Sequence, residues 1–305
     1  MQCFITIDVE PDNVWANTQS KKLFNLNHLW KFNELCFQYD LKVNYFITYS
    51  VAKDINCVKI LENILKRGNC EIGIHSHMWE IPPISSNDLN NEALTGNLYP
   101  KEIVEEKFSN LINLIKKNFD YPKSHRAGRF GMSNAQLKIL MKNNIIVDSS
   151  IVPGIDWSET GINNYLNAKN EIYEMDENNF LNSGSSGVIQ VPCTVKPIYF
   201  KNSFLNTGIY KKILNKLGLK YNWLRVSPEK KIDDFKETID WVIKSNLGFL
   251  NLMSHSSEFM VNGSPYWTSK NEIEYQFTLY KNIFTIWRDL NFKSELLSNL
   301  SKNTI

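Results

Sequence analysis

Two histidines stand one residue apart in the segment GIHSHMW, at the end of a short apolar run. Successive side chains of a strand point to opposite faces, so His75 and His77 share a face if the run is a strand. Imidazole nitrogens placed together in this way can bind a divalent metal ion. A lone pair of histidines can equally be structural, so the interpretation depends on which other residues come to the same place.

A second same-face pair, made of carboxylates, lies in the segment TIDVEPD near the start of the chain. Asp8 and Glu10 point the same way there, and Val9 points to the opposite side. Carboxylate and imidazole ligands together suit Zn2+, and Co2+, Ni2+ or Mn2+ can also bind them. The two segments predict a divalent-metal site, and their spacing leaves open whether Asp8 or Glu10 is the acidic ligand.

Polar residues also follow three further runs that resemble buried strands. Arg126 and Arg129 lie in SHRAGRFG, Asp148 follows an apolar run, and His255 ends LNLMSH. One such arginine is usually a partner in a surface ion pair, and one such aspartate is usually a helix cap. Together with the two pairs above, however, they supply a base, a cation to orient it and a histidine able to act as an acid. Metal-assisted hydrolysis needs such a set.

The elements that must position these residues alternate between strands and helices. Runs rich in β-branched or aromatic residues predict strands over 3–9, 43–48, 70–76, 145–150, 188–192 and 249–255. Apolar residues at helical spacing predict helices over 23–39, 55–66, 101–118, 133–143, 231–245 and 270–289. This order favours an α/β barrel of parallel strands over a doubly wound sheet. The polar residues then fall at the carboxyl ends of strands, where such folds build their sites.

Three long segments interrupt the alternation, namely 77–99, 151–186 and 196–230. Long irregular segments in α/β proteins usually follow strand ends and line the site. We expect a single domain over 1–305, with insertions at 151–186 and 196–230.

The composition is that of an ordinary globular protein, and it restricts the possible partners. Lys and Arg number 34 against 32 Asp and Glu, so no general field attracts nucleic acid or an anionic membrane. The five cysteines include no CxxC pair, which argues against a disulfide framework and against a cysteine-type zinc site. No apolar run could form a signal sequence or span a bilayer, so we expect a cytoplasmic protein. The sequence does not indicate its oligomeric state.

In the order TIDVEPD, EIGIHSHMW, RAGRFG, DSS and LMSHSSE, the chain resembles the five successive motifs of the NodB-homology polysaccharide deacetylases, carbohydrate esterase family 4. It resembles in particular their WbmS-like branch, which is found with O-antigen and capsule genes. The resemblance spans about residues 3–260. It implies a distorted (β/α) barrel and a metal-dependent hydrolase that removes an N- or O-acyl group, usually acetyl, from a sugar or oligosaccharide.

The resemblance implies a set of metal ligands with two departures from the usual motifs. Val9 stands where the usual motif has its metal-binding aspartate, so Glu10 is the expected replacement ligand. His75 matches the first motif histidine, but the usual second one lies four residues on, where this chain has Trp79. His77 must then serve as the second histidine ligand.

The resemblance also implies the catalytic residues. Asp8 matches the base that takes a proton from the attacking water, and Arg126 resembles the arginine that pairs with this base and keeps it ionised. His255 resembles the general acid that protonates the leaving sugar amine. Asp148, which lacks the tryptophan that closely follows it in the family, is expected to tune His255.

Arg129 is expected to contact either the substrate or a second carboxylate, and a backbone amide near Phe130 is expected to hold the developing oxyanion. Flat aromatic faces stack on sugar rings, and the candidates in loops after predicted strands are Trp15, Trp79, Trp157, Tyr266 and Trp267. Packing in the core is the alternative role for any one of them. The segment that ends in Trp267 is the strongest candidate, because it comes shortly after His255.

Two other functional classes fit parts of the pattern. An amidohydrolase-type barrel also uses two histidines at this spacing as metal ligands, but it places them after its first strand, where this chain has the acidic pair. A degenerate, non-catalytic barrel that binds glycan or a partner protein is the main rival, because Val9 and Trp79 depart from the motifs. Bound metal would distinguish the enzyme from the degenerate barrel.

Overall fold

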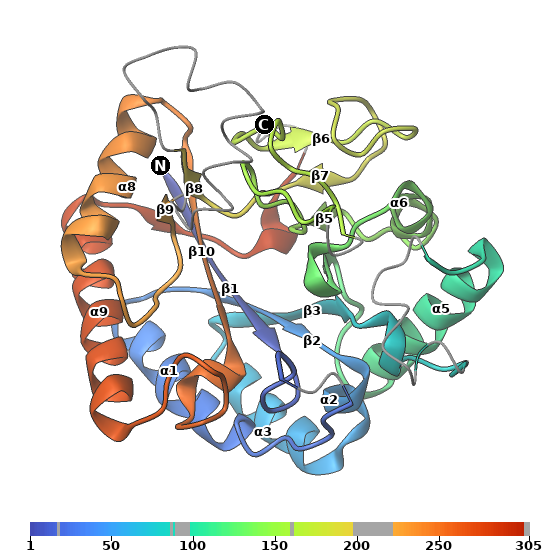
Figure 1. Cartoon of the computed structure of the whole chain (residues 1–305), viewed down its shortest axis with the longest axis horizontal. Coiled ribbons are helices and arrows are strands. Elements are labelled where there is room, and N and C mark those ends of the chain that lie inside the picture. The colour runs from blue at the N-terminus through green and yellow to red at the C-terminus, as the bar shows by residue number, and fades with distance from the viewer. Residues whose placement is uncertain (17–18, 86–87, 89–97, 159–161, 198–221, 302–305) are drawn as a thin grey trace.

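A curled, mostly parallel sheet forms the centre of the molecule, and the computed structural model describes residues 1–16, 19–85, 88, 98–158, 162–197 and 222–301 (Figure 1). Its strands are β1 Gln2–Val9, β2 Val43–Ile47, β3 Cys70–Ser76, β4 Ser124–Ala127, β5 Val147–Asp148, β6 Tyr173–Glu174, β7 Ile189–Gln190, β10 Phe249–His255 and β11 Lys293–Ser294. Their order is β10-β1-β2-β3-β4-β5-β7-β6, with β11 also paired to β1. Only β6 and β7 pair in antiparallel fashion within this described sheet.

The helices lie around the outside of the curled sheet (Figure 1). The α-helices are α1 Leu26–Gln38, α2 Tyr49–Lys53, α3 Ile55–Leu65, α5 Lys101–Asn118, α6 Asn134–Lys142, α8 Ile232–Lys244 and α9 Lys270–Asp289. All six helices predicted from apolar spacing are present, with ends within a few residues of the predicted ones. The single-domain, distorted-barrel fold expected from the sequence is therefore confirmed.

Several elements differ from the predicted ones. The predicted strands did not include β4, whose sequence SHRA is polar, and the helical pattern did not show the short α2. A second, two-stranded sheet pairs β8 Val195–Lys196 with β9 Asn222–Trp223. Most of the predicted insertion 196–230 falls on 198–221, outside the described residues, so both insertion boundaries stay predictions.

The inner face of the sheet changes from apolar to polar along its strands. Its lower layer is a buried apolar cluster formed by Phe4, Phe46, Val147, Ile189, Val191, Phe249, Leu297 and Leu300. Further along the same faces of β1 and β10, Thr6 donates a hydrogen bond of 2.9 Å to Asn251. Asp8 and His255 follow at the carboxyl ends of these two strands. The apolar layer therefore closes the bottom of the barrel, and polar side chains are left at its mouth.

The opposite face of each strand packs against the helices. Ile5, Ile7 and Val9 of β1 belong to a larger buried cluster that includes apolar residues of α1, α3, α5 and α9. Strands of a parallel sheet that is covered on both faces have nearly continuous apolar sequences, which explains why most residues of β1 are apolar. This alternation decides which side of the sheet each polar residue can reach.

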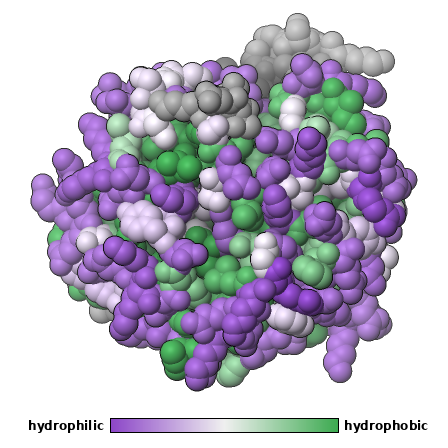
Figure 2. Space-filling view, turned by 180° about the vertical axis from the view of Figure 1, so that it is seen from behind, coloured by the Kyte–Doolittle hydropathy of each residue, from purple (hydrophilic) through white to green (hydrophobic). Residues whose placement is uncertain are grey.

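The outer surface seen from behind is mostly hydrophilic, with apolar residues in small separate groups (Figure 2). Within the part of the chain that the structure describes, no helix has the length and apolar character needed to cross a membrane.

A buried lysine anchors the segment that follows His77. Lys107 of α5 is fully buried, and its Nζ donates hydrogen bonds of 2.7 Å to the backbone carbonyls of Ile81 and Pro83. The same atom lies 3.4 Å from the buried carboxylate of Asp88. A buried ammonium group is tolerated only with such partners, so Lys107 ties α5 to the loop that leads away from the site.

We expect Lys107→Met to lower the free energy of unfolding by about 3 kcal/mol, because it leaves a buried carboxylate and two carbonyls without their donor. Urea denaturation measures this change. Lys117→Met, at an exposed position of the same helix, is the matched control. Equal stability of the two variants would show that the buried ammonium group does not hold the loop.

Candidate functional site

Four polar side chains meet at the carboxyl ends of the strands, on the inner face of the sheet. In the strand register, Asp8 of β1 lies opposite His255 of β10, and His75 of β3 lies opposite Arg126 of β4. All four residues are buried. The parallel register therefore brings together residues that are far apart in the sequence. The sequence predicted this meeting, because it placed these residues at the carboxyl ends of parallel strands.

Arg126 is fully buried and fixes the position of Asp8. Its Nη1 donates a hydrogen bond of 2.8 Å to Asp8 Oδ1, and its Nη2 donates to the hydroxyls of Thr6 (2.9 Å) and Ser149 (2.8 Å). Its Nε donates to the Ser149 carbonyl at 2.8 Å, and the guanidinium lies 4.7 Å from the centre of the Phe46 ring. The expected pairing of Arg126 with Asp8 is observed. Asp8 Oδ2 is left to face His75 and His255, whose Nε2 atoms both lie at 3.7 Å.

Glu10, His75 and His77 form a buried group whose ligand atoms all lie within 4.8 Å of one another. Glu10 Oε2 lies 3.3 Å from His77 Nε2 and 3.8 Å from His75 Nε2. His75 Nδ1 donates to the carbonyl of Arg126 at 3.0 Å, which leaves the lone pair of Nε2 facing the carboxylate. Glu10 Oε1 is buried and has no hydrogen-bond partner among the described residues. Such orphaned atoms are rare, and this donor set suits a divalent cation, so the cluster fits the predicted metal.

The protonation states in this group depend on one another. Burial alone would raise the pKa of Glu10, but His255, His75 and His77 hold it well below its ordinary value. Burial lowers the pKa of His77, and the neighbouring His75 lowers it further. For His75, burial also acts to lower the pKa, but Asp8 and Glu10 outweigh it and raise the pKa above its usual value. A metal ion binds the unprotonated imidazole, so metal and protons would compete for His75.

The ring of His77 is held between two neighbours. Trp79 stacks on it with ring centroids 4.3 Å apart and an angle of 25° between the planes. On the chain after β4, a Cβ atom added to Gly128 would lie 2.7 Å from His77 Cδ2 and 2.8 Å from the Ser76 carbonyl, so only glycine fits there. Trp79 and Gly128 together thus fix the orientation of the His77 ring.

His255 lies beside a carboxylate that the sequence interpretation did not identify. Glu258 Oε2 is 3.7 Å from His255 Nδ1 and accepts hydrogen bonds from Ser254 Oγ (2.6 Å) and the His255 backbone N–H (3.1 Å). Glu258 Oε1 accepts from Arg225 Nη2 at 2.5 Å. Burial opposes ionisation of Glu258, but Arg225 and these donors lower its pKa to about 2. A fixed negative charge therefore faces the second nitrogen of His255.

The prediction that Asp148 tunes His255 is wrong. Asp148 Oδ1 lies 2.7 Å from His125 Nδ1 and accepts from the hydroxyl of Ser150 at 2.7 Å. The inner face of β5 carries Val147, so the strand alternation turns Asp148 toward the helix side of the sheet. His125 alternates in the same way with Arg126 and meets Asp148 there. Asp148 is therefore a buried structural residue behind the site.

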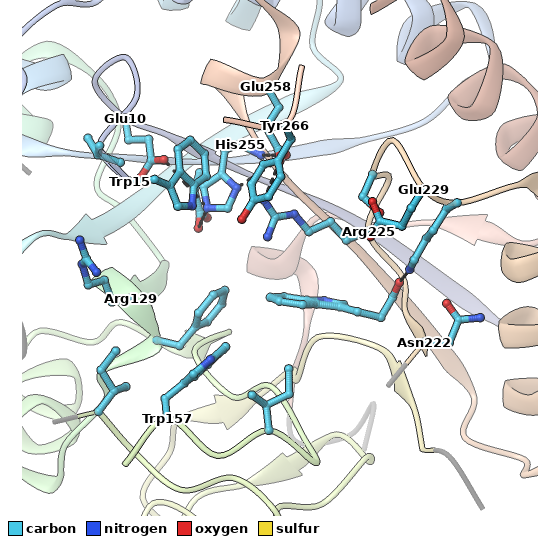
Figure 3. Close-up of a pocket in the computed structure, with 18 of the residues that line it drawn as sticks. Glu10, Trp15, Arg129, Trp157, Asn222, Arg225, Glu229, His255, Glu258 and Tyr266 are labelled. Carbon is cyan, nitrogen blue, oxygen red and sulfur yellow. Dashed lines mark hydrogen bonds and ion pairs between the residues drawn. The ribbon is translucent and has the colours of Figure 1, made fainter. Parts of the chain in front are cut away.

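The site opens into a cavity of about 1470 Å³ within the described part of the chain. Figure 3 shows Glu10, Trp15 and His255 at one end of this cavity, and Asn222 and Glu229 at the other. Aromatic residues make up much of its wall, namely Trp15, Trp79, Phe130, Trp157, Trp223 and Tyr266. Four of the five aromatic candidates from the sequence line the cavity.

Trp267 is the exception, and its predicted contact with substrate is wrong. Its side chain is fully buried in the main apolar core, whereas the preceding Tyr266 faces the cavity. Arg129 and Phe130, also predicted to contact substrate, both line the cavity. Phe130 stacks on Trp157 with centroids 5.3 Å apart and an 18° angle.

No protein-family model matches the chain, and no curated protein does. Solved structures share its fold at low identity. A candidate polysaccharide deacetylase of Mycobacterium smegmatis is 12% identical with a TM-score of 0.55, over 98% of this chain and 94% of that one. A candidate glycoside hydrolase/deacetylase of Parabacteroides distasonis is 13% identical with a TM-score of 0.60, over 96% and 68%.

A 4-alpha-glucanotransferase of Thermococcus litoralis is 14% identical with a TM-score of 0.56, and the match covers 98% of this chain but 39% of that one. At such identities these likenesses establish the fold only. The chain thus has the single-domain, NodB-type deacetylase fold that the sequence predicted. Because this fold supports several reactions, the reaction of this chain must be inferred from the side chains of its site.

We expect the purified protein, loaded with Zn2+ and dialysed, to retain about one ion per chain, because the buried Glu10, His75 and His77 provide a ready set of ligands. His77→Ala and Glu10→Gln should each weaken metal retention by more than about tenfold. Elemental analysis measures the metal.

His28→Ala, at an exposed histidine of α1, is the control and should retain the wild-type metal content. A wild-type protein that takes up none of Zn2+, Co2+ and Ni2+ would contradict the assignment and leave His75 and His77 as structural residues.

Proposed function

We propose that the protein is a metal-dependent hydrolase of the NodB-homology type that removes an N- or O-acyl group, in particular acetyl, from a sugar. The observation that carries the proposal is the buried cluster of Glu10, His75 and His77 beside the Asp8–Arg126 pair. His255 lies on the other side of Asp8, at the mouth of an aromatic-lined cavity. These groups supply a metal site, a base and an acid within a few ångströms of one another.

Asp8 is the proposed general base. A divalent ion on Glu10, His75 and His77 would supply Lewis acidity, which lowers the pKa of a water molecule from 15.7 to about 7. Asp8 Oδ2 then accepts the proton as the water attacks the acyl carbon. Arg126 holds the other oxygen of Asp8, so the base keeps a fixed direction toward the cavity. Glu10 is the acidic ligand in this scheme, because it approaches both histidines whereas Asp8 is committed to Arg126.

His255 is the proposed general acid. An amine leaves a tetrahedral intermediate poorly unless its nitrogen receives a proton, and His255 Nε2 faces the same space as Asp8 Oδ2. Glu258, held by Arg225 and Ser254, faces His255 Nδ1 and takes the positioning role that the sequence interpretation assigned to Asp148. A carboxylate on the far side of an imidazole keeps the ring oriented.

The walls of the cavity support a saccharide as substrate. Trp15 packs edge-on against His255 with ring centroids 4.7 Å apart, and Tyr266 packs edge-on against Trp15. Aromatic faces next to the reacting groups are the usual means of binding the apolar faces of a sugar ring. The motif resemblance to the WbmS-like branch supports a place in O-antigen or capsule biosynthesis, where acylated sugars are the substrates.

The rival functions make different demands on these residues. Glycosyl transfer of the kind named for the Thermococcus litoralis structure needs two carboxylates free to act on a glycosidic bond. In this site Asp8 is paired with Arg126, and Glu10 faces two histidines. A degenerate barrel is favoured by Val9 and Trp79, but Glu10 and His77 supply the same types of ligand from neighbouring positions. Metal-assisted hydrolysis therefore accounts for more of the site than either rival.

We expect His255→Ala to lower turnover by about 10²–10⁴-fold while metal content stays at the wild-type level, because the variant loses the acid but none of the proposed ligands. Acetate release from a panel of N- and O-acetylated sugars measures turnover, and elemental analysis measures the metal. Loss of metal in this variant would reassign His255 as a ligand. The absence of acetate release from a metal-loaded wild type across the panel would favour a binding protein.

Glu258→Gln and Asp148→Asn compare the two carboxylates directly. We expect Glu258→Gln to lower kcat by about tenfold or more, with unchanged metal content. Asp148→Asn should lower the melting temperature and leave kcat unchanged. The reverse pattern would restore Asp148 to the role predicted from the sequence.

A further inference from the structure

Arg129 differs from the other basic side chains of the cavity in having no polar partner. Its guanidinium lines the cavity, and no hydrogen bond or ion pair joins it to any described residue. The other arginine and the two lysines that line the described part of the cavity each have a polar partner. Arg225 pairs with Glu258, Lys196 pairs with Glu237, and Lys230 donates a hydrogen bond to the carbonyl of Trp223. An unpaired guanidinium in a partly buried position indicates that its partner is a bound molecule.

The backbone holds Arg129 in this position at a conformational cost. Arg129 and Phe130 have φ values of 51° and 57°, in the left-handed region that residues with a Cβ atom rarely adopt. The turn is fixed from both sides. Gly128 packs against His77, and the hydroxyl of Tyr165 donates a 2.6 Å hydrogen bond to the Phe130 carbonyl. Strain that the surroundings maintain in this way is typical of residues kept for a function.

Arg129 does not serve to neutralise the metal ligands. Burial lowers the pKa of Arg129 and the negative charge of Glu10 raises it, but no ion pair of 4.0 Å or less joins the two side chains. The guanidinium instead lies 5.7 Å from the centre of the Trp79 ring, whose plane stacks on His77. His77, Trp79 and Arg129 therefore form a series that leads from the cluster of proposed metal ligands into the cavity. Figure 3 shows Arg129 on the side of the cavity opposite Arg225.

We propose that Arg129 binds a negatively charged group of the saccharide, a carboxylate or a phosphate, close to the sugar that carries the acyl group. This inference rests on the proposed function and narrows its substrate to acidic sugars. The planar fork of a guanidinium matches the paired oxygens of both groups, and an ammonium group does not. A sugar acid and a sugar phosphate would present the same chemistry to this residue, so the experiment must compare them.

Calorimetric titration of metal-free protein with glucuronic acid, glucose 1-phosphate and neutral glucose tests the proposal. Removal of metal with a chelator prevents a bound cation from attracting the anionic probes. We expect at least one anionic probe to bind about tenfold or more tightly than glucose, as one charge-assisted contact provides. Arg129→Gln should abolish this preference, and Arg129→Lys should keep only part of it because the fork is lost.

Arg288→Gln is the matched control, since Arg288 is an exposed residue of α9 whose ion-pair partner is its neighbour Asp289. It should bind all three probes as the wild type does. The stronger anionic probe identifies carboxylate or phosphate as the preferred group. Equal binding of anionic and neutral probes, no binding by any of them, or a preference that persists in Arg129→Gln would each overturn the proposal. The measurement involves no turnover, so failure of the deacylation assay is a separate result.

Discussion

The buried pair of Arg126 and Asp8 is the interaction on which the site depends. Two charges placed inside a barrel cost several kcal/mol each unless they are paired and hydrogen-bonded. Arg126 meets this condition with donors to Asp8, Thr6 and Ser149, which lie on β1 and just after β5. Because the pair joins strands from both halves of the sheet, the position of Asp8 Oδ2 relative to the histidines is fixed by the packing of the barrel as a whole.

The alternation of strand side chains determines which polar residues take part. Asp8, Arg126 and His255 fall on the inner face, while His125 and Asp148 fall on the helix side, where they pair with each other. Both aspartates follow an apolar strand and both are buried, so residue type and burial do not distinguish them. The face of the strand does, and it separates a residue at the mouth of the cavity from one that fastens β4 to β5.

Features set by local geometry could be predicted from the sequence, and those set by loop conformation could not. The pairs Asp8 with Glu10 and His75 with His77 follow from the two-residue period of a strand. Tyr266 and Trp267 are neighbours in a loop without such a period, so the sequence does not tell which one faces the cavity. The same holds for Glu258, whose place beside His255 depends on the short turn after β10. Likewise, β4 was not predicted because its sequence is polar. It is nevertheless a buried strand, and its polar side chains form hydrogen bonds inside the protein.

The two departures from the family motifs have a common geometric explanation. Val9 lies on the helix side of β1 and packs in the apolar core, so a carboxylate on the cavity face must come from position 8 or position 10. Arg126 holds one oxygen of Asp8, and Glu10 approaches both His75 and His77. Trp79 cannot bind metal but stacks on His77 and holds its ring. Each departure is thus accompanied by a side chain of a metal-binding type at a nearby position, in the buried group of Glu10, His75 and His77.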